Sequence, residues 1–142
     1  MTSTTQAVLA LDVGERRIGV AVASLEARIA NPLSTLDRQD EGDIFTRINS
    51  LVQQHQAHAV VVGLPRGMAG QETAQTISTR NFAATLEKSI TIPVYMQDEA
   101  GTSLAAEAEL KKIKKPYQKG DIDKLAATYI LSDWLAEQER NI

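Results

Sequence analysis

The stretch from Val8 to Ala23, VLALDVGERRIGVAVA, constrains the fold of this chain more than any other. Two apolar runs rich in strand-forming residues flank a short polar turn, which is the pattern of a β-hairpin. One acid, Asp12, ends the first run, where a carboxylate carries a desolvation cost unless a metal ion or a hydrogen-bonded turn compensates it. Asp and Gly also favour turns, so Asp12 before Gly14 is equally consistent with ordinary turn chemistry. The hairpin therefore predicts either a ligand-bearing site or a plain turn.

The composition predicts one compact domain. A chain of 142 residues is near the commonest domain size, and we expect residues 1–142 to form a single domain. Apolar residues make up 43% and charged residues 23% of the chain, which favours a globule over disorder. The absence of cysteine excludes a disulfide framework, a thiolate metal site and a cysteine nucleophile. Because no secretory signal and no apolar run of about 20 residues are visible, we expect a cytoplasmic protein that does not enter a membrane.

The charge distribution bears on nucleic-acid binding. A net charge of −3 argues against indiscriminate binding, which usually needs a strong basic field. One short segment nevertheless concentrates five lysines: Lys111, Lys112, Lys114, Lys115 and Lys119. This cluster is compatible with a nucleic-acid ligand and equally with a solvated surface loop.

The remaining pattern predicts an α/β domain. A third strand is expected over Arg28–Leu36, at an edge of the sheet because of Pro32. The run AVVVGL at Ala59–Leu64 is typical of a parallel strand buried on both faces. A further strand is expected over 92–96, and helices over 40–55, 73–88, 102–112 and 121–139. The order indicates a mixed sheet, with three antiparallel strands followed by parallel strands and helices on both faces.

Two helices have an expected inward face. In the helix over 73–88, Ile77, Phe82 and Leu86 are spaced to face the core. The expected inward stripe of the last helix consists of Ile122, Leu125, Ala126, Tyr129, Ile130 and Trp134.

Acidic residues stand where strands end or helices begin. They are Asp12 after the first strand, Asp98 and Glu99 after the last strand, and Asp121 and Asp123 at the start of the last helix. Strand ends meet at one edge of such a sheet, where ligands usually bind. Converging carboxylates repel one another unless a divalent cation neutralises them, and Mg²⁺ or Mn²⁺ suits an all-oxygen site. Two ions about 3.5–4 Å apart would serve phosphodiester hydrolysis by activating water and stabilising the leaving oxygen. Taken singly, these acids also fit helix caps and loop charges.

Basic residues accompany these acids. Arg16 and Arg17 in the hairpin, with Arg66 in a glycine-rich loop, are candidate phosphate contacts. The loop Gly63–Gly70 could bring backbone amides close to a phosphate, although it lacks the spaced glycines and lysine of a P-loop.

Four stretches together resemble the YqgF family, also called the RuvX or pre-16S rRNA nuclease family, within the ribonuclease H-like superfamily. They are LALDVGERRIGVAVA, VVVGLPRGMAGQE, QDEAGTS with its following AEAEL, and DKLAATYIL. The resemblance implies a divalent-metal nuclease in which Asp12, Glu99 and Asp123 match the family's acidic triad. The family is associated with maturation of the 5′ end of 16S rRNA. It is also described as a Holliday-junction resolvase, by analogy with RuvC, which shares the fold.

The chain departs from the common family pattern in two places. Ala100 and Gly101 follow the Asp-Glu pair where the family usually has Arg-Leu, and Met68-Ala69-Gly70 replaces part of the usual Asn-Met-Asp-Gly. Neither change removes a metal ligand, and both fall in loops that would face substrate.

The leading hypothesis is a Mg²⁺- or Mn²⁺-dependent endonuclease acting on structured nucleic acid, with precursor 16S rRNA as the expected substrate and Holliday-junction DNA as the alternative. Asp12, Glu99 and Asp123 would be both catalytic and metal-binding, and the segment Lys111–Lys119 would engage the nucleic-acid backbone. Two hypotheses of other classes stay open: a non-catalytic nucleic-acid-binding module, and an ATP-handling relative of the actin and sugar-kinase fold. The chain would act as a monomer or a homodimer.

Overall fold

The computed structural model describes residues 6–99, 102–113 and 116–140. Within these ranges the elements in chain order are β1 (Ala7–Val13), β2 (Arg17–Ser24), β3 (Asn31–Asp37), α1 (Ile44–His55), β4 (Ala57–Pro65), α2 (Ala74–Ser89), β5 (Val94–Glu99), α3 (Thr102–Ile113) and α4 (Lys119–Arg140). In this part of the chain, no helix combines the length and the apolar character that crossing a membrane requires.

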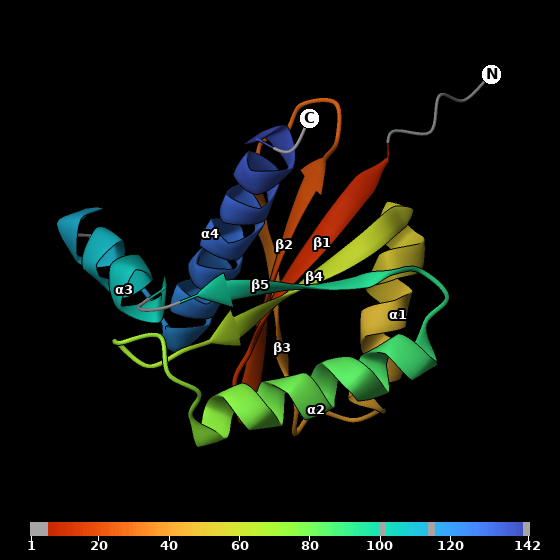
Figure 1. Cartoon of the computed structure of the whole chain (residues 1–142), viewed down its shortest axis with the longest axis horizontal. Helices are drawn as coiled ribbons and strands as arrows, with labels where there is room; N and C mark the ends of the chain where they lie inside the picture. The colour runs from red at the N-terminus through yellow and green to blue at the C-terminus, as the bar shows by residue number, and fades with distance from the viewer. Residues whose placement is uncertain (1–5, 100–101, 114–115, 141–142) are drawn as a thin grey trace.

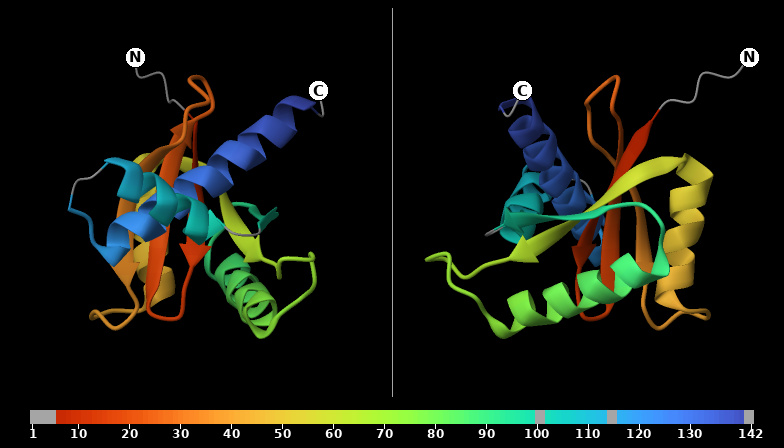
Figure 2. Two further views of the ribbon diagram at one scale, coloured as in Figure 1. Left: turned by 90° about the vertical axis from the view of Figure 1, so that its left-hand side faces the viewer. Right: turned by 45° about the vertical axis from the view of Figure 1, so that its right-hand side comes forward.

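The five strands form one mixed sheet in the order β3-β2-β1-β4-β5. The first three strands pair antiparallel, and β4 and β5 run parallel to β1. Helices α1 and α2 cover one face, whereas α4 covers the other and carries α3 on its outer side (Figures 1 and 2). This arrangement confirms the predicted fold class.

The alternation of side chains along β1 assigns each residue to one face of the sheet. Leu9 and Leu11 belong to the core cluster beneath α1 and α2, whereas Val8 and Ala10 pack with residues of α4. Because successive side chains of a strand point to opposite faces, Asp12 lies on the α4 face. The central strand therefore delivers this carboxylate to the side of the sheet where the last helix packs.

The same alternation holds on the edge strand β5. The ring of Tyr95 packs against Trp134 of α4, and the Gln97 amide donates a hydrogen bond to Glu137 of the same helix. Glu99, two residues further on, therefore shares the α4 face with Asp12.

The first half of the sheet differs from prediction at one boundary. The third strand begins at Asn31 rather than Arg28, because Arg28 has a φ of 56°, in the left-handed region that strands do not use. Its edge position is confirmed, and the register with β2 shifts close to Pro32, between Val20 and Ala21. The edge placement explains how proline is accommodated, since it cannot donate to the ladder.

The second half of the chain differs from prediction at the ends of its elements and in which helical side chains are buried. The strand expected to stop at residue 96 continues to Glu99, because its ladder with β4 runs on to Pro65. The expected burial of Ile77 is wrong, since its side chain is 56% exposed. The predicted inward face of α4 is only partly right, because that helix contacts both the sheet and α3. Of the predicted residues only Ala126 and Ile130 are buried, and Ala127, Leu131 and Leu135 are buried in addition.

Candidate active site

Asp12 and Asp123 come together where α4 crosses the hairpin. Asp12 pairs with Gly19 across the two strands of the hairpin. A side chain on Gly19 would overlap the backbone carbonyl of Asp123, so only glycine allows α4 to approach the strand this closely. The first turns of α4 thus bring Asp123 to the strand end that carries Asp12, although 110 residues separate them in sequence.

The electrostatics of Asp12 reflect this placement. Burial raises the pKa of the Asp12 carboxyl from 3.8 to about 6, and the negative charge of Asp123 adds to the rise. Desolvation is the larger cause, since the carboxylate sits among β1, β2 and α4 rather than in bulk water. A cation placed here would relieve both the burial cost and the repulsion between the two carboxylates.

Arg17 holds the second carboxylate. Its Nε donates a hydrogen bond to Asp123 Oδ2 across 2.7 Å, and the two side chains are 32% and 18% exposed. This ion pair links the start of α4 to β2 beside Asp12. Arg17, predicted as a phosphate contact, is thus engaged with a predicted metal ligand.

Glu99 lies on the same face, two strands away from Asp12. Neighbouring strands are about 4.8 Å apart, so β4 separates the backbones of β1 and β5 by about 10 Å. Nowhere in residues 6–99, 102–113 and 116–140 are three His, Cys, Asp or Glu side chains grouped closely enough to hold one metal ion. The structure therefore brings Asp12 and Asp123 together. Glu99 lies on the same face of the sheet, at the end of the edge strand β5.

The chemistry of this donor set fits a hard divalent cation. Two carboxylates lie side by side, one of them desolvated, and carboxylate oxygens are the ligands that Mg²⁺ prefers. Mg²⁺ is usually held by one or two carboxylates together with waters and substrate phosphates, so the pair Asp12–Asp123 matches that requirement.

The other acids expected at this edge are engaged elsewhere. Asp98 faces away from α4 and accepts from Arg66, whose guanidinium also pairs with Glu72. Asp121 accepts from the Gln118 amide at the start of α4, and this hydrogen bond lowers the pKa of its carboxyl. Asp121 therefore acts as a local helix-start acid.

A shallow cleft of about 420 Å³ borders the candidate site. It is lined by Arg66, Gly70, Asp98 and Glu99, so the glycine-rich loop and the end of β5 form its walls. Gly70 has a φ of 82°, a conformation that favours glycine, and closes a turn onto Gly67. Ala100 and Gly101, the departure from the family pattern, lie outside the described residues.

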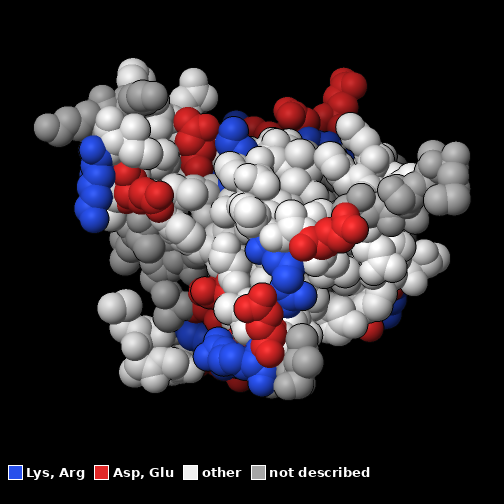
Figure 3. Space-filling model, turned by 90° about the horizontal axis from the view of Figure 1, so that it is seen from above, with Lys and Arg blue, Asp and Glu red and all other residues white. Residues whose placement is uncertain are grey.

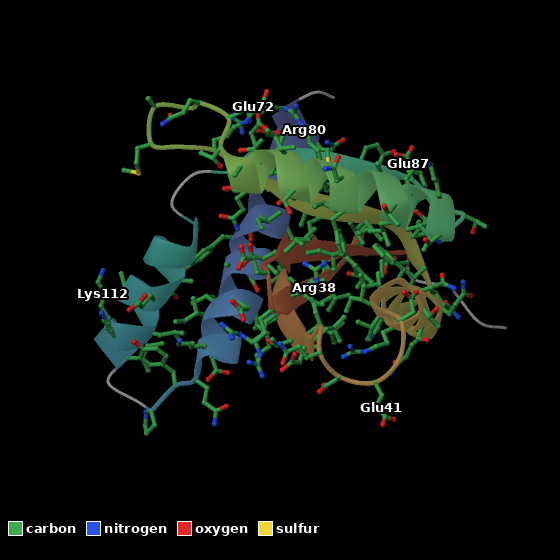
Figure 4. All side chains as sticks on the ribbon, turned by 90° about the horizontal axis from the view of Figure 1, so that it is seen from below. Arg38, Glu41, Glu72, Arg80, Glu87 and Lys112 are labelled. Atoms are coloured by element: carbon green, nitrogen blue, oxygen red, sulfur yellow. The ribbon has the colours of Figure 1, made fainter. Side chains whose placement is uncertain are left out.

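The predicted basic contacts do not form one patch in the described part of the chain. Arg16 pairs with Asp37 across 3.5 Å, and Lys111 pairs with Glu107 on its own helix. Figure 4 shows Lys112 pointing outward from α3, away from the sheet, and Lys119 is exposed at the start of α4. Lys114 and Lys115 lie outside the described residues.

The charges on the side of the molecule drawn in Figure 3 are likewise mixed. Figure 3 shows Lys and Arg next to Asp and Glu on this side, rather than gathered into a basic surface. This agrees with the argument from net charge against indiscriminate binding to nucleic acid.

Two residues of this region were not singled out by sequence reasoning. Gly19 could have been found, because a glycine inside a strand often marks close approach of another backbone. Arg38 could not, because nothing in its neighbourhood distinguishes it in the sequence; its guanidinium donates to the Gly14 carbonyl across 2.9 Å.

Comparison with known proteins identifies close relatives. Two strains of Chloroflexus aurantiacus have a protein named "Putative pre-16S rRNA nuclease" that is 44% identical over 138 residues, covering 96% of this chain and 90% of the relative. A protein of the same name from Maridesulfovibrio salexigens is 34% identical over 131 residues, covering 91% of this chain and 97% of the relative.

Solved structures show the fold. RuvC of T. thermophilus in complex with a Holliday junction substrate superposes with a TM-score of 0.51 at 16% identity, covering 94% of this chain and 96% of RuvC. The Fowlpox virus resolvase in complex with Holliday junction DNA gives a TM-score of 0.54 at 10% identity, covering 93% and 98%. The profile of the family described as "RuvX: Holliday junction resolvase" matches residues 6–137. The chain therefore belongs to the RuvX family and has a ribonuclease H-like fold similar to that of RuvC resolvases.

Proposed function

We propose that this protein is a divalent-metal-dependent endonuclease of the cytoplasm that cleaves structured nucleic acid, with the 5′ region of precursor 16S rRNA as its substrate. The observation that carries the proposal is the juxtaposition of Asp12 and Asp123, from the central strand and the last helix, on one face of the sheet. The names of the relatives support the choice of substrate.

Each residue has a distinct part in the proposed chemistry. Asp12 and Asp123 would hold the metal, and Glu99 would complete the site from the neighbouring edge. A bound Mg²⁺ or Mn²⁺ would supply Lewis-acid polarisation of the phosphate and activation of water. Arg17 fixes the orientation of the Asp123 carboxylate, which keeps the two acids adjacent in spite of their repulsion.

Holliday-junction DNA is the second candidate substrate. The family description names a Holliday junction resolvase, and two similar folds were solved with junction DNA. A resolvase cuts two symmetry-related strands, so this function requires a homodimer. A precursor-RNA nuclease can act as a monomer, so a monomer in solution would exclude the resolvase function.

The test is a side-by-side cleavage assay with Mg²⁺ or Mn²⁺. The substrates are a precursor 16S rRNA 5′ fragment and a four-way DNA junction, and solution mass is measured in parallel. Asp12→Asn and Asp123→Asn should abolish cleavage. Asp133→Asn is the matched control on the same helix as Asp123, because Asp133 is exposed.

The outcomes separate the candidates. RNA cleavage by the wild type that both active-site variants lose supports the proposal, and junction cleavage by a dimer supports the alternative. Binding of nucleic acid that is equal in wild type and variants, without cleavage of either substrate, would indicate the non-catalytic module.

A further inference from the structure

A second cleft lies on the opposite face of the sheet from Asp12. It has a volume of about 740 Å³ and separates the turn of the β1–β2 hairpin from the first turns of α2. Figure 4, seen from below, places Arg38 between α2 and the loop that leaves β3. None of the residues proposed above for catalysis or metal binding lines this cleft.

Arg38 brings a positive charge that no carboxylate neutralises within the described ranges. Arg16, Arg17 and Arg66 all form ion pairs with acids. Arg38 instead donates to the Gly14 carbonyl and lies with its guanidinium carbon 5.2 Å from the ring centroid of Phe82. These contacts hold the guanidinium against the cleft and leave its charge available for an anion.

The first turn of α2 adds backbone donors to the wall of the cleft. The Thr73 cap accepts from the amides of Thr76 and Ile77. The amides of Ala74 and Gln75, which both line the cleft, have no carbonyl within the helix to donate to. The positive end of the helix dipole therefore faces the cleft.

The unpaired hydroxyl group of Thr79 is the feature that indicates a ligand. The Thr79 side chain is 2% exposed and lines the cleft, yet its hydroxyl makes no hydrogen bond with any described residue. Other helical threonines, Thr85 and Thr128, donate to the carbonyl of the preceding turn. The Thr79 hydroxyl oxygen is not among the fully enclosed unpaired atoms of the described residues, so it opens onto the cleft and can hydrogen-bond to a group that enters there.

We propose that this cleft binds a backbone phosphate of the nucleic-acid strand on which the carboxylates act; the inference rests on the proposed function and extends it. Arg38 supplies the charge, the amides of Ala74 and Gln75 point at the anion, and Thr79 donates its hydroxyl. Glu15 also lines the cleft; like Arg38 it is exposed, so solvent screens the repulsion of the one and the attraction of the other.

The cleft is placed for a strand that also reaches the candidate active site. Val13 in its wall is the residue directly after Asp12, and its side chain belongs to the core cluster on the α1 and α2 face. Because successive side chains of a strand point to opposite faces, Asp12 and Val13 lie on opposite faces of the sheet at the end of β1. A nucleic-acid strand crossing the end of β1 would therefore meet the carboxylates on one face and the cleft on the other.

The test measures binding without cleavage. A fluorescently labelled RNA hairpin with a single-stranded flank is titrated in EDTA over a range of salt concentrations. Arg38→Gln should weaken binding roughly tenfold and lower the slope of log affinity against log salt by about 1. Thr79→Val, which keeps the shape and removes the hydroxyl, should weaken binding roughly threefold with an unchanged slope. Arg38→Lys should restore most of the slope, because it restores the charge.

Arg140→Gln is the matched control. Arg140 lies at the far end of α4 and, like Arg38, has no ion pair with a described carboxylate. This variant should bind the RNA as tightly as the wild type does. Unchanged affinity in folded Arg38→Gln and Thr79→Val proteins would overturn the proposal. The proposal would also be overturned if ATP or inorganic phosphate raised the melting temperature of the wild type as much as the RNA does and had no such effect on Arg38→Gln. The cleft would then bind a free phosphate ligand. Failure of the nuclease proposal shows separately, as equal cleavage by wild type and Asp12→Asn.

Discussion

Arg17 Nε lies 2.7 Å from Asp123 Oδ2, and this ion pair joins the second strand to the last helix beside the Asp12 carboxylate. It keeps two acids adjacent that would otherwise repel each other. A cation bound by Asp12 and Asp123 would take over part of this role, so the ion pair and the proposed metal site are coupled.

The first prediction concerns this coupling. Arg17→Gln should lower the free energy of unfolding by about 3 kcal/mol in EDTA, because it leaves two partly buried carboxylates facing each other without a cation. Mg²⁺ should raise the melting temperature of the variant by more than that of the wild type, since the ion replaces the missing charge. Thermal and urea unfolding measure both effects.

The control for this variant is Arg16→Gln. The Arg16–Asp37 pair is longer, at 3.5 Å, and the Arg16 side chain is 58% exposed, so its loss should change stability by less than about 1 kcal/mol. Equal destabilisation by both variants would show that the Arg17 pair has no special place in the site.

The second prediction concerns pH. The pKa of Asp12 is about 6 in the folded protein against an ordinary 3.8, so the folded state binds more protons between these values. The contribution of the Asp12 carboxyl to the free energy of unfolding therefore falls as the pH rises from about 4 to about 6. Near pH 7 this contribution is lower by about 3 kcal/mol.

Urea unfolding of wild type and Asp12→Asn in EDTA from pH 4 to pH 8 tests this sign. The variant should gain stability relative to the wild type as the pH rises from about 4 to about 6 and then hold a constant advantage. Parallel stability curves would mean that the Asp12 carboxylate is not destabilised by its surroundings.

The third prediction concerns the metal alone. Mg²⁺ or Mn²⁺ should raise the melting temperature of the wild type by mass action on the folded state. Asp12→Asn should lose most of this response, and Asp133→Asn should keep it. A response that survives in Asp12→Asn would place the ion elsewhere.

The fourth prediction concerns the close approach of α4 to the hairpin. Gly19→Ala should destabilise the fold by several kcal/mol, because its methyl group would overlap the Asp123 carbonyl and push the helix away. Gly120→Ala is the control, since its methyl would meet Thr35 at an ordinary 3.4 Å. Denaturant unfolding of the two variants should give clearly different midpoints.

Much of the fold could be predicted from local sequence patterns. The hairpin, the buried strand β4 and the helices follow from apolar periodicity and turn residues, which act over a few positions. The position of Asp12 at the inner end of the hairpin could be predicted for the same reason. These features depend on neighbours in sequence.

The contacts within the site were not accessible in this way. The partners Arg17 and Asp123 are 106 residues apart, and no local rule joins them. The face on which Glu99 lies depends on the strand continuing past residue 96, which the ladder with β4 decides. Arg38 and Thr79 line the same cleft only because α2 packs beside the hairpin turn.

The most direct test of the central claim is the rate at which wild type and Asp12→Asn cleave a precursor 16S rRNA 5′ fragment in Mg²⁺. We predict cleavage by the wild type and a loss of more than about 100-fold in the variant, which keeps the fold but lacks a metal-binding carboxylate. Equal rates in the two proteins would contradict the account.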